Sequence, residues 1–595
     1  MERRTIRRYG VKRKLILIGA IAVASTWVAA AGPFQSSGRA PAIPARVPAV
    51  FPAAWRFPSG AHATFAVHAM VASDEPIASK VGADIMKQGG NAVDAAVAVG
   101  FALAVTFPEA GNLGGGGFMV IRMANGRSAA LDYRETAPLA ATRDMYVGPD
   151  GKLTGQSVIG PRASGVPGAV AGMVEAHRRF GVLPLAKVLA PAIRLASEGF
   201  TVDAALSHSL SDGNYRISGF AGKSLFIPNG APPPIGSTLV QPELARTIRL
   251  IAQVGSGAFY QGSIADSIAA EMKRGGGLIT KEDLARYRPI WRDPIRSTYR
   301  GYTYLAMPPS SSGGTTMSEI LNILEAYGPA APFGTAPRIH AYASASQRAF
   351  VDRNSKLGDP AFVQAPVATL VSKAYARTLA KSISRDHADP TTSLTSQSGE
   401  GSHTTHYSVV DASGNAVATT TTLNDLYGSG VFVRGAGFFL NDEMDDFAAK
   451  PGTPNMFGLV QGEANAIAPG KRMLSAMSPT IVLDPKGNLL LVTGARGGPR
   501  IISATSQIIL DVIDHRMSLA DAMSAPRVHH QALPDSIRVE KGGFLAEVLA
   551  RLRAMGHNVY EGGGVASAAA IMRVKGGYEG MDDTRVRGAV GAAGY

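Results

Sequence analysis

The stretch from residue 389 to residue 423 constrains the fold of this chain more than any other. Residues 389–402 are polar, rich in Gly, Ser and Thr, and without any apolar period, which predicts a mobile loop. Two β-branched runs follow, at 407–410 and 416–423, and turn residues separate them, so we expect a hairpin. Thr404 therefore stands where a polar loop meets the first strand of a sheet.

A threonine in this position has an unusual chemical option. If the bond between His403 and Thr404 is cut, Thr404 becomes a chain terminus with its own α-amine, whose ordinary pKa is about 8. Such an amine can take the proton of the neighbouring hydroxyl and turn it into a nucleophile. The alternative is an ordinary strand threonine with no chemical role.

The N-terminal segment has the composition of a targeting signal. Residues 1–14 hold seven Lys or Arg and one Glu, and residues 15–31 carry no charge and end in small residues. This pattern is typical of a cleaved signal peptide over residues 1–31, although 17 uncharged residues also approach the length of a membrane anchor. Residues 32–61 are rich in Pro and Ala, which favours a semi-rigid linker before a folded part that begins near His62.

Composition excludes several classes of chemistry. The chain has 595 residues and no cysteine, so it has neither disulfides nor thiol nucleophiles. The net charge is +14, but the Lys and Arg residues form no block outside the leader, and the sequence gives no support for nucleic-acid binding. No motif indicates a metal or a cofactor. The run Gly114–Gly117 leads into a strand rather than a helix, so it predicts an anion nest or a tight turn but no dinucleotide site.

Three further segments carry candidate site residues. Arg134 stands near the tip of a strand and can hold a carboxylate with two parallel hydrogen bonds, or form a surface salt bridge. Residues 442–446 hold four acids in five positions, which suits either an ammonium site or a solvated loop. The Gly/Pro-rich residues 450–471 suggest a cover loop, and the pair Gly497–Gly498 can present two N–H groups to an oxyanion or form a simple turn.

In this order the motifs resemble the gamma-glutamyltransferase family of N-terminal-nucleophile hydrolases. The resemblance spans roughly residues 62–595. Its motifs lie at residues 89–97, 114–119, 132–138, 358–360, 404–408, 441–447, 475–480 and 497–498.

The family implies an α+β fold, a four-layer αββα sandwich that large and small subunits form together after self-cleavage before Thr404. The subunits would be residues 62–403 and 404–595, which stay together as a heterodimer of the chain's own fragments. Position by position, Thr404 matches the nucleophile, and Thr422 matches a threonine that supports it. The remaining matches concern the donor: the carboxylate site is matched by Arg134 and Ser475, the α-amine site by Asn424, Glu443 and Asp446, and the oxyanion hole by Gly497 and Gly498.

Four positions depart from the family pattern. Ala476 replaces a second serine that often helps to bind the carboxylate, and Phe457 stands where some bacterial members have a tyrosine. Arg496 and Pro499 alter the usual Ser-Pro-Gly-Gly surroundings of the glycine pair. We expect these changes to affect substrate affinity and acceptor choice more than the type of reaction.

The sequence therefore predicts an exported, self-processing γ-glutamyl hydrolase and transferase, with glutathione as the expected donor and water, an amino acid or a peptide as acceptor. One alternative is a cephalosporin-type glutaryl acylase on the same scaffold, which the retained Asp446 disfavours. The other is a non-catalytic, membrane-tethered binding protein, which the retained Thr404, Thr422 and glycine pair disfavour.

Overall fold

The computed structural model describes residues 46–57, 61–391, 404–585 and 591–595. The expected leader and most of the expected linker lie outside these residues, as do residues 392–402 of the polar loop and His403.

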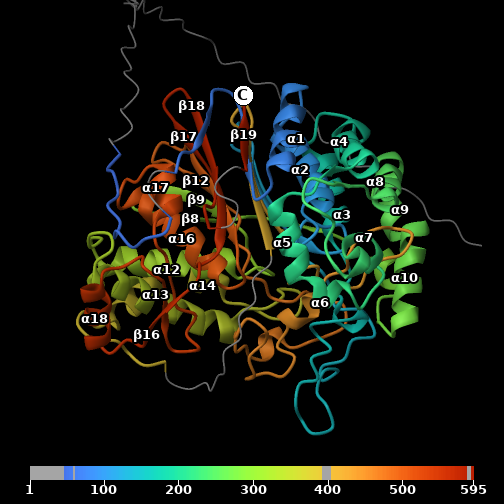
Figure 1. The fold of residues 1–595 in the computed structure, drawn as a ribbon. Helices are drawn as coiled ribbons and strands as arrows, with labels where there is room; N and C mark the ends of the chain where they lie inside the picture. Colours follow the sequence, from blue (N-terminus) through green and yellow to red (C-terminus); the bar gives the residue numbers. More distant parts are fainter. Residues whose placement is uncertain (1–45, 58–60, 392–403, 586–590) are drawn as a thin grey trace, which may run out of the picture. The chain divides into compact units, whose positions relative to one another are not determined.

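Two antiparallel sheets of seven strands each form the centre of the fold (Figure 1). The first sheet has the order β19 (Ala592–Gly594), β2 (Met70–Ser73), β10 (Thr404–Val410), β11 (Ala416–Thr422), β3 (Gly116–Arg122), β4 (Ser128–Tyr133) and β7 (Ile290–Arg292). The second has the order β1 (Thr64–Ala66), β18 (Gly577–Asp582), β17 (Ser567–Val574), β13 (Leu489–Arg496), β12 (Thr480–Leu483), β9 (Tyr302–Ala306) and β8 (Ile295–Tyr299). Strand β10 packs face to face against β13 and β17, so the sheets are the two inner layers.

Helices cover the outer face of each sheet. The first sheet is covered by α1 (Pro76–Lys87), α2 (Ala92–Thr106) and α3 (Ala169–Phe180), with α4 (Leu185–Glu198) and α8 (Pro242–Val254) further out. The second is covered by α12 (Gly313–Tyr327), α16 (Arg500–Ile513) and α17 (Leu519–Ser524), with α13 (Ala336–Lys356) and α15 (Lys373–Lys381) packed on α12. The αββα sandwich that the family resemblance implies is confirmed.

Smaller elements complete the chain. The remaining helices are α5 (Ala204–Asp212), α6 (Asn214–Ile217), α7 (Lys223–Phe226), α9 (Gly257–Tyr260), α10 (Ser263–Gly275), α11 (Lys281–Arg286), α14 (Val367–Leu370) and α18 (Ala546–Ala554). Two minor sheets are formed by β5 (Phe200–Thr201) with β6 (Thr238–Leu239), and by β14 (Val528–His529), β15 (Ile537–Glu540) and β16 (Val559–Gly562).

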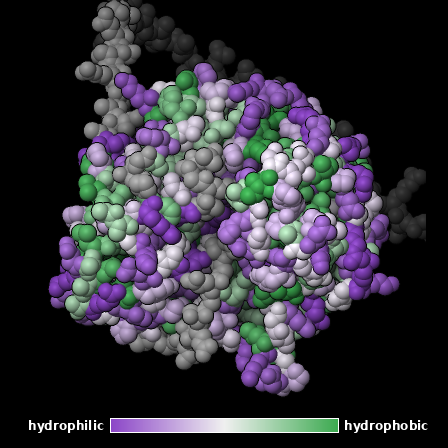
Figure 2. Space-filling view, viewed as in Figure 1, coloured by the Kyte–Doolittle hydropathy of each residue, from purple (hydrophilic) through white to green (hydrophobic). Residues whose placement is uncertain are grey.

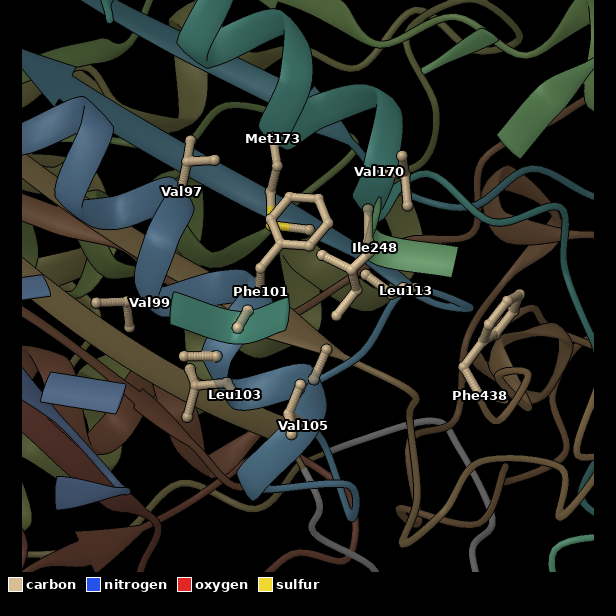
Figure 3. Close-up of a cluster of buried hydrophobic side chains, with 14 of the residues drawn as sticks. Val97, Val99, Phe101, Leu103, Val105, Leu113, Val170, Met173, Ile248 and Phe438 are labelled. Atoms are coloured by element: carbon tan, nitrogen blue, oxygen red, sulfur yellow. The ribbon is translucent and has the colours of Figure 1, made fainter. Parts of the chain in front are cut away.

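The side chains of β10 point alternately to its two faces, and the strand therefore contributes to two hydrophobic cores. Tyr407 and Val409 belong to the apolar core under the helices of the first sheet, whereas Val410 belongs to the core that includes the second sheet. Because successive strand side chains point to opposite faces, a central strand of a sandwich packs against both neighbouring layers. In the first core, Phe101 of α2 lies beside Met173 of α3 (Figure 3).

Helix α2 shows how the local sequence fixes one element of this layer. Asn91 caps its N-terminus, accepting hydrogen bonds from the N–H groups of Val93 and Asp94, and the Asp94 carboxylate accepts one from the N–H of Asn91. This reciprocal capping box fixes the start of the helix. Its Ala and Val side chains are buried on every face, between the first sheet and α4.

The surface seen in Figure 2 is mixed, with hydrophilic residues interspersed among smaller hydrophobic groups. Among the residues that the structure describes, no helix combines the length and apolar character needed to cross a bilayer. Part of the segment expected to act as a linker packs on the folded unit. The indole N–H of Trp55 donates to the carbonyl oxygen of Ser524 at 2.8 Å.

Candidate active site

The predicted hairpin exists, and it places two threonines opposite each other. Thr404 is the first residue of β10, and its register partner is Thr422, the last residue of β11. The hydroxyl of Thr404 donates to that of Thr422 at 3.2 Å, and the Asn424 N–H donates to the same Thr422 oxygen at 2.8 Å. The scissile bond proposed from the sequence joins Thr404 to His403, which lies outside the described residues.

One small pocket gathers nearly all the residues predicted from the sequence. Thr404 and Thr422 lie in its wall, together with side chains from elements far apart in the chain. The other predicted residues in the wall are Arg134, Asn424, Glu443, Asp446, Phe457, Ser475, Ala476 and Gly498. Gly497 directly precedes Gly498 and is not itself part of the wall. The pocket's free volume is about 20 Å³, so these side chains nearly fill it.

Arg134 is the buried centre of the polar wall. It follows β4, and its side chain is inaccessible to solvent, so it is not a surface salt bridge. One terminal nitrogen lies 2.5 Å from Oε1 of Glu443, and the other donates to the carboxylate of Asp446. The alternative of a solvated acidic loop is therefore wrong, because Glu443–Asp446 form a short, largely buried 3₁₀ helix. Its Glu443 and Asp446 face Arg134, whereas Asp445 accepts a hydrogen bond of 2.7 Å from the Ser157 hydroxyl.

Burial sets the electrostatics of these acids. It raises the pKa of both Glu443 and Asp446, and the Arg134 guanidinium opposes the rise. For Arg134 burial acts to lower the pKa, but the carboxylates of Glu443 and Asp446 outweigh it and the net shift is upward. The guanidinium of Arg353, which also lines the pocket, likewise acts to lower the pKa of Asp446.

Two charged residues of this site were missed in the sequence. Glu135 is fully buried, and Oε2 lies 3.6 Å from Nη1 of Arg134, but neither of its oxygens accepts a hydrogen bond from a described residue. Burial raises its pKa to about 7. Arg353 on α13 lines the pocket, and burial lowers its pKa to about 10. Within the described ranges it forms no ion pair, and it donates instead to the Oγ of Ser312 at 2.9 Å.

The sequence held only a weak signal for these two residues. Glu135 follows Arg134 directly, and adjacent opposite charges at a strand end are common on surfaces. Arg353 lies within Asp-Arg-Asn on a helix, which is typical of an exposed polar face. Their burial becomes evident only from the packing of distant elements.

The glycine pair forms a tight turn between β13 and α16. Gly498 has φ +56°, and a Cβ there would lie 3.0 Å from the ring of Phe457, so the turn requires both the conformational freedom and the small size of glycine. At the other glycine run, a Cβ on Gly115 would lie 2.0 Å from the carbonyl oxygen of Thr422. Of the two alternatives for Gly114–Gly117, an anion nest or a tight turn, the structure shows the tight turn, packed against the end of β11.

The residues of the predicted cover loop contribute to the pocket as well. Phe457 and Leu459 form part of its wall, and the side-chain amides of Gln461 and Asn465 donate to the carbonyl oxygen of Asp446 at 3.1 and 2.7 Å. The loop thus holds the acidic turn in place while covering the pocket.

A larger cavity of about 750 Å³ lies elsewhere, lined by residues such as Phe220, Lys223, Leu244 and Phe432. It contains none of the residues predicted from the sequence, so its size does not make it the site. In the part of the chain that the structure describes, no group of His, Asp and Glu side chains is arranged to hold a metal ion.

A two-sheet sandwich with a threonine at the start of a central strand, facing an arginine and a pair of acids, defines the class of N-terminal-nucleophile hydrolases. The comparisons with known proteins specify the family. The sequence profile described as Gamma-glutamyltranspeptidase matches residues 78–593, and the chain belongs to this family. The prediction of an enzyme of γ-glutamyl transfer is thereby confirmed.

Individual relatives support this assignment and one alternative. The chain is 48% identical over 527 residues to the "Glutathione hydrolase proenzyme" of Escherichia coli strain K12, covering 86% of this chain and 89% of the relative. It is 40% identical over 485 residues to the "Acylase ACY 1 proenzyme" of Pseudomonas sp. strain V22, covering 79% and 85%. Among solved structures, the cephalosporin acylase from Bacillus halodurans superposes with a TM-score of 0.80 at 29% identity, over 91% of this chain and 99% of the other.

Proposed function

We propose that the chain cuts itself between His403 and Thr404, and that the freed Thr404 then cleaves the γ-glutamyl amide of glutathione and related donors. The observation that carries the proposal is one pocket containing a threonine hydroxyl at a strand start, a buried arginine and two acids. A γ-glutamyl group presents a carboxylate, an ammonium and a scissile amide at fixed spacing, and these three features match the three kinds of side chain.

The chemistry would proceed through an acyl-enzyme. The α-amine of the cut Thr404 takes the proton from its own Oγ1, which attacks the γ-carbonyl carbon. The N–H groups of the Gly497–Gly498 turn would stabilise the negative oxygen that forms. The C–N bond then breaks, and the leaving amine takes the proton. Water or an acceptor amine attacks the resulting ester, releases the γ-glutamyl group and restores the hydroxyl.

The binding roles follow from charge. Arg134, helped by the Ser475 hydroxyl, would hold the α-carboxylate of the donor, and Glu443, Asp446 and Asn424 would surround its ammonium. Thr422, already hydrogen-bonded to Thr404, would orient the nucleophile. Because the free volume of the pocket is small, a donor enters only when the cover loop that carries Phe457 moves.

The domain assignment is part of the same proposal. Residues 62–403 would form the large subunit and 404–595 the small one, held together by the shared sheet in which β10 pairs with β2 and β11 with β3. We also infer from the leader that residues 1–31 direct export, so that the enzyme works outside the cytoplasm, free or held by an uncleaved leader.

A denaturing gel and terminal sequencing test the self-cleavage. The wild type should give two fragments, the smaller beginning Thr-Thr-His-Tyr, and should release the aniline from a γ-glutamyl anilide. Thr404→Ala should remain a single inactive chain. A single uncut chain with full wild-type turnover would refute the mechanism.

The acylase relative and the cephalosporin acylase structure favour a second candidate, removal of a glutaryl group. A glutaryl donor lacks the α-ammonium, so it would leave Asp446 and Glu443 without the cation that they are placed to meet.

A further inference from the structure

Arg496 connects the two sheets beside the proposed nucleophile. It is the last residue of β13, directly before Gly497. Its Nη1 lies 2.9 Å from Oε1 of Glu109, and its Nε lies 3.5 Å from Oδ2 of Asp74. The same oxygen of Asp74 accepts a hydrogen bond of 2.9 Å from the hydroxyl of Thr405, the residue next to Thr404.

The burial of these groups makes the connection stiff. Arg496, Asp74 and Glu109 are each less than 10% exposed. Burial alone would lower the pKa of Arg496, but the two carboxylates raise it, so the guanidinium stays charged. A planar guanidinium that meets acids from two different loops has little freedom to move. The guanidinium carbon also lies 5.3 Å from the centre of the Phe107 ring, and this contact further restricts the movement of the Arg496 side chain.

Arg496 does not itself line the pocket, so any effect on the reaction passes through its neighbours. In one direction it is bonded to Gly497, which begins the proposed oxyanion turn. In the other it reaches Thr405 through Asp74, and Thr405 is bonded to Thr404. The two reacting parts of the site belong to different sheets, and this buried ion cluster joins them.

We propose that Arg496 is a positioning residue that sets the distance between the Gly497–Gly498 turn and the Thr404 hydroxyl. The inference rests on the proposed function, because it concerns the same nucleophile and the same oxyanion. Arg496 is also one of the departures from the Ser-Pro-Gly-Gly pattern, so its role is a property of this chain. Oxyanion donors act only where the negative oxygen forms, and a displacement of about 1 Å can cost about 100-fold in rate.

Arg496→Lys is the first test, because lysine keeps the positive charge but loses the planar fork that reaches both acids. We expect the variant to cut itself into two fragments. We expect its kcat on a γ-glutamyl anilide to fall by about 10-fold to 100-fold. Its KM should stay within about twofold of the wild type, because Arg134 and Asp446 are untouched.

A matched control separates positioning from stability. Arg338 is also largely buried, and its Nη2 lies 3.4 Å from Oδ2 of Asp514, but it is not part of the pocket wall. Arg338→Lys should lower the melting temperature and leave kcat and KM at 20 °C unchanged. If Arg496→Lys behaves in the same way, with wild-type kcat at 20 °C, Arg496 is merely structural and the inference is wrong.

A second pair of variants serves if Arg496→Lys does not fold or cut itself. Thr405→Val removes the hydroxyl that Asp74 holds, and Thr405→Ser retains it. We expect kcat to fall in Thr405→Val and to stay near the wild-type value in Thr405→Ser. Equal kcat in the two variants would overturn the inference. A wild type that is uncut or inactive would instead refute the proposed function, so the two failures are distinct.

Discussion

Arg134 donates a hydrogen bond to the carboxylate of Asp446, although 312 residues separate them in the chain. The side chain proposed to hold the donor's carboxylate is thus paired with one proposed to hold its ammonium. A zwitterionic donor can exchange this ion pair for two, one with Arg134 and one with Asp446. A donor with a carboxylate alone would bind Arg134 and leave Asp446 without that counter-charge. The Arg134–Asp446 ion pair therefore discriminates between the two kinds of donor.

Arg134→Lys should weaken donor binding much more than it slows the reaction of bound donor. Lysine keeps the charge but cannot bridge two carboxylates, or one carboxylate twice, with parallel hydrogen bonds. We expect KM for a γ-glutamyl anilide to rise by about 10-fold or more and kcat to change by less than about threefold. Steady-state kinetics with Arg338→Lys as control measure this. An unchanged KM would show that Arg134 does not bind the donor.

Thr422→Val should slow both self-cleavage and turnover. The Thr422 hydroxyl accepts hydrogen bonds from the Thr404 hydroxyl and from the Asn424 N–H. Each is worth about 0.5–1.5 kcal/mol, so losing both predicts a loss of roughly 5-fold to 150-fold in rate. Thr422→Ser keeps the hydroxyl and should stay near the wild type. The time course of cutting on a denaturing gel gives the answer, and wild-type cutting by Thr422→Val would remove the role proposed for Thr422.

Ala476→Ser should strengthen donor binding. Ala476 lies in the pocket wall next to Ser475, where the family pattern often has a second serine. One added hydrogen bond to the donor carboxylate contributes about 0.5–1.5 kcal/mol, which predicts a KM about 2-fold to 10-fold lower. Ala476→Val adds bulk without a hydroxyl and should not lower KM. If both variants raise KM alike, the position has no room for a donor contact.

Elements whose sequence patterns are local could be predicted from the sequence alone. The alternation in β10, the turn before β11 and the Asn91 cap all depend on neighbouring residues, and all were predictable. The ion pair between Arg134 and Asp446 was not predictable, because it depends on β4 and the acidic turn meeting in space. For the same reason Arg353 resembled a residue of an exposed helix face. The burial of Glu135 was not predictable either, because the adjacent pair Arg134–Glu135 resembles an exposed ion pair.

Glu135 should make the folded chain less stable as pH rises. Burial raises its pKa in the folded state to about 7, whereas an unfolded glutamate has a pKa of about 4.3. Below pH 4 both states hold the proton, and between pH 4 and 7 only the folded state keeps it. The stabilisation from this group is therefore present at low pH and lost as pH rises to about 7, by roughly 4 kcal/mol in total.

Glu135→Gln tests this in the Thr404→Ala background, where the chain is expected to stay in one piece. Glutamine does not titrate, so the stability of the variant relative to its background should improve from pH 5 to about pH 7 and level off above that. Urea unfolding at several pH values measures the difference. Parallel stability curves for the two proteins over this range would show that the Glu135 pKa is not raised.

The role of Asp446 separates the transferase from the acylase. A γ-glutamyl donor carries an ammonium at Cα, and a glutaryl donor has only hydrogens there. An acid facing that position attracts the first donor and loses its counter-charge with the second. Sites built to bind a polar group can reject the analogue that lacks it by several orders of magnitude. We therefore expect the wild type to prefer γ-glutamyl anilide strongly over glutaryl anilide in kcat/KM.

Asp446→Asn should narrow this preference, chiefly by losing activity on the γ-glutamyl donor. An amide cannot balance the ammonium charge. The substitution also frees one of the two terminal nitrogens of Arg134, while the other stays paired with Glu443, and this favours a donor that brings a carboxylate alone. Ser475→Ala serves as the matched control: it removes a hydroxyl from the carboxylate side of the pocket and should weaken both donors equally. The measurement is kcat/KM for the two anilides on all three proteins. Equal values for the two anilides in the wild type would overturn the transferase assignment in favour of the acylase, because Asp446 would then face no ammonium in the reaction.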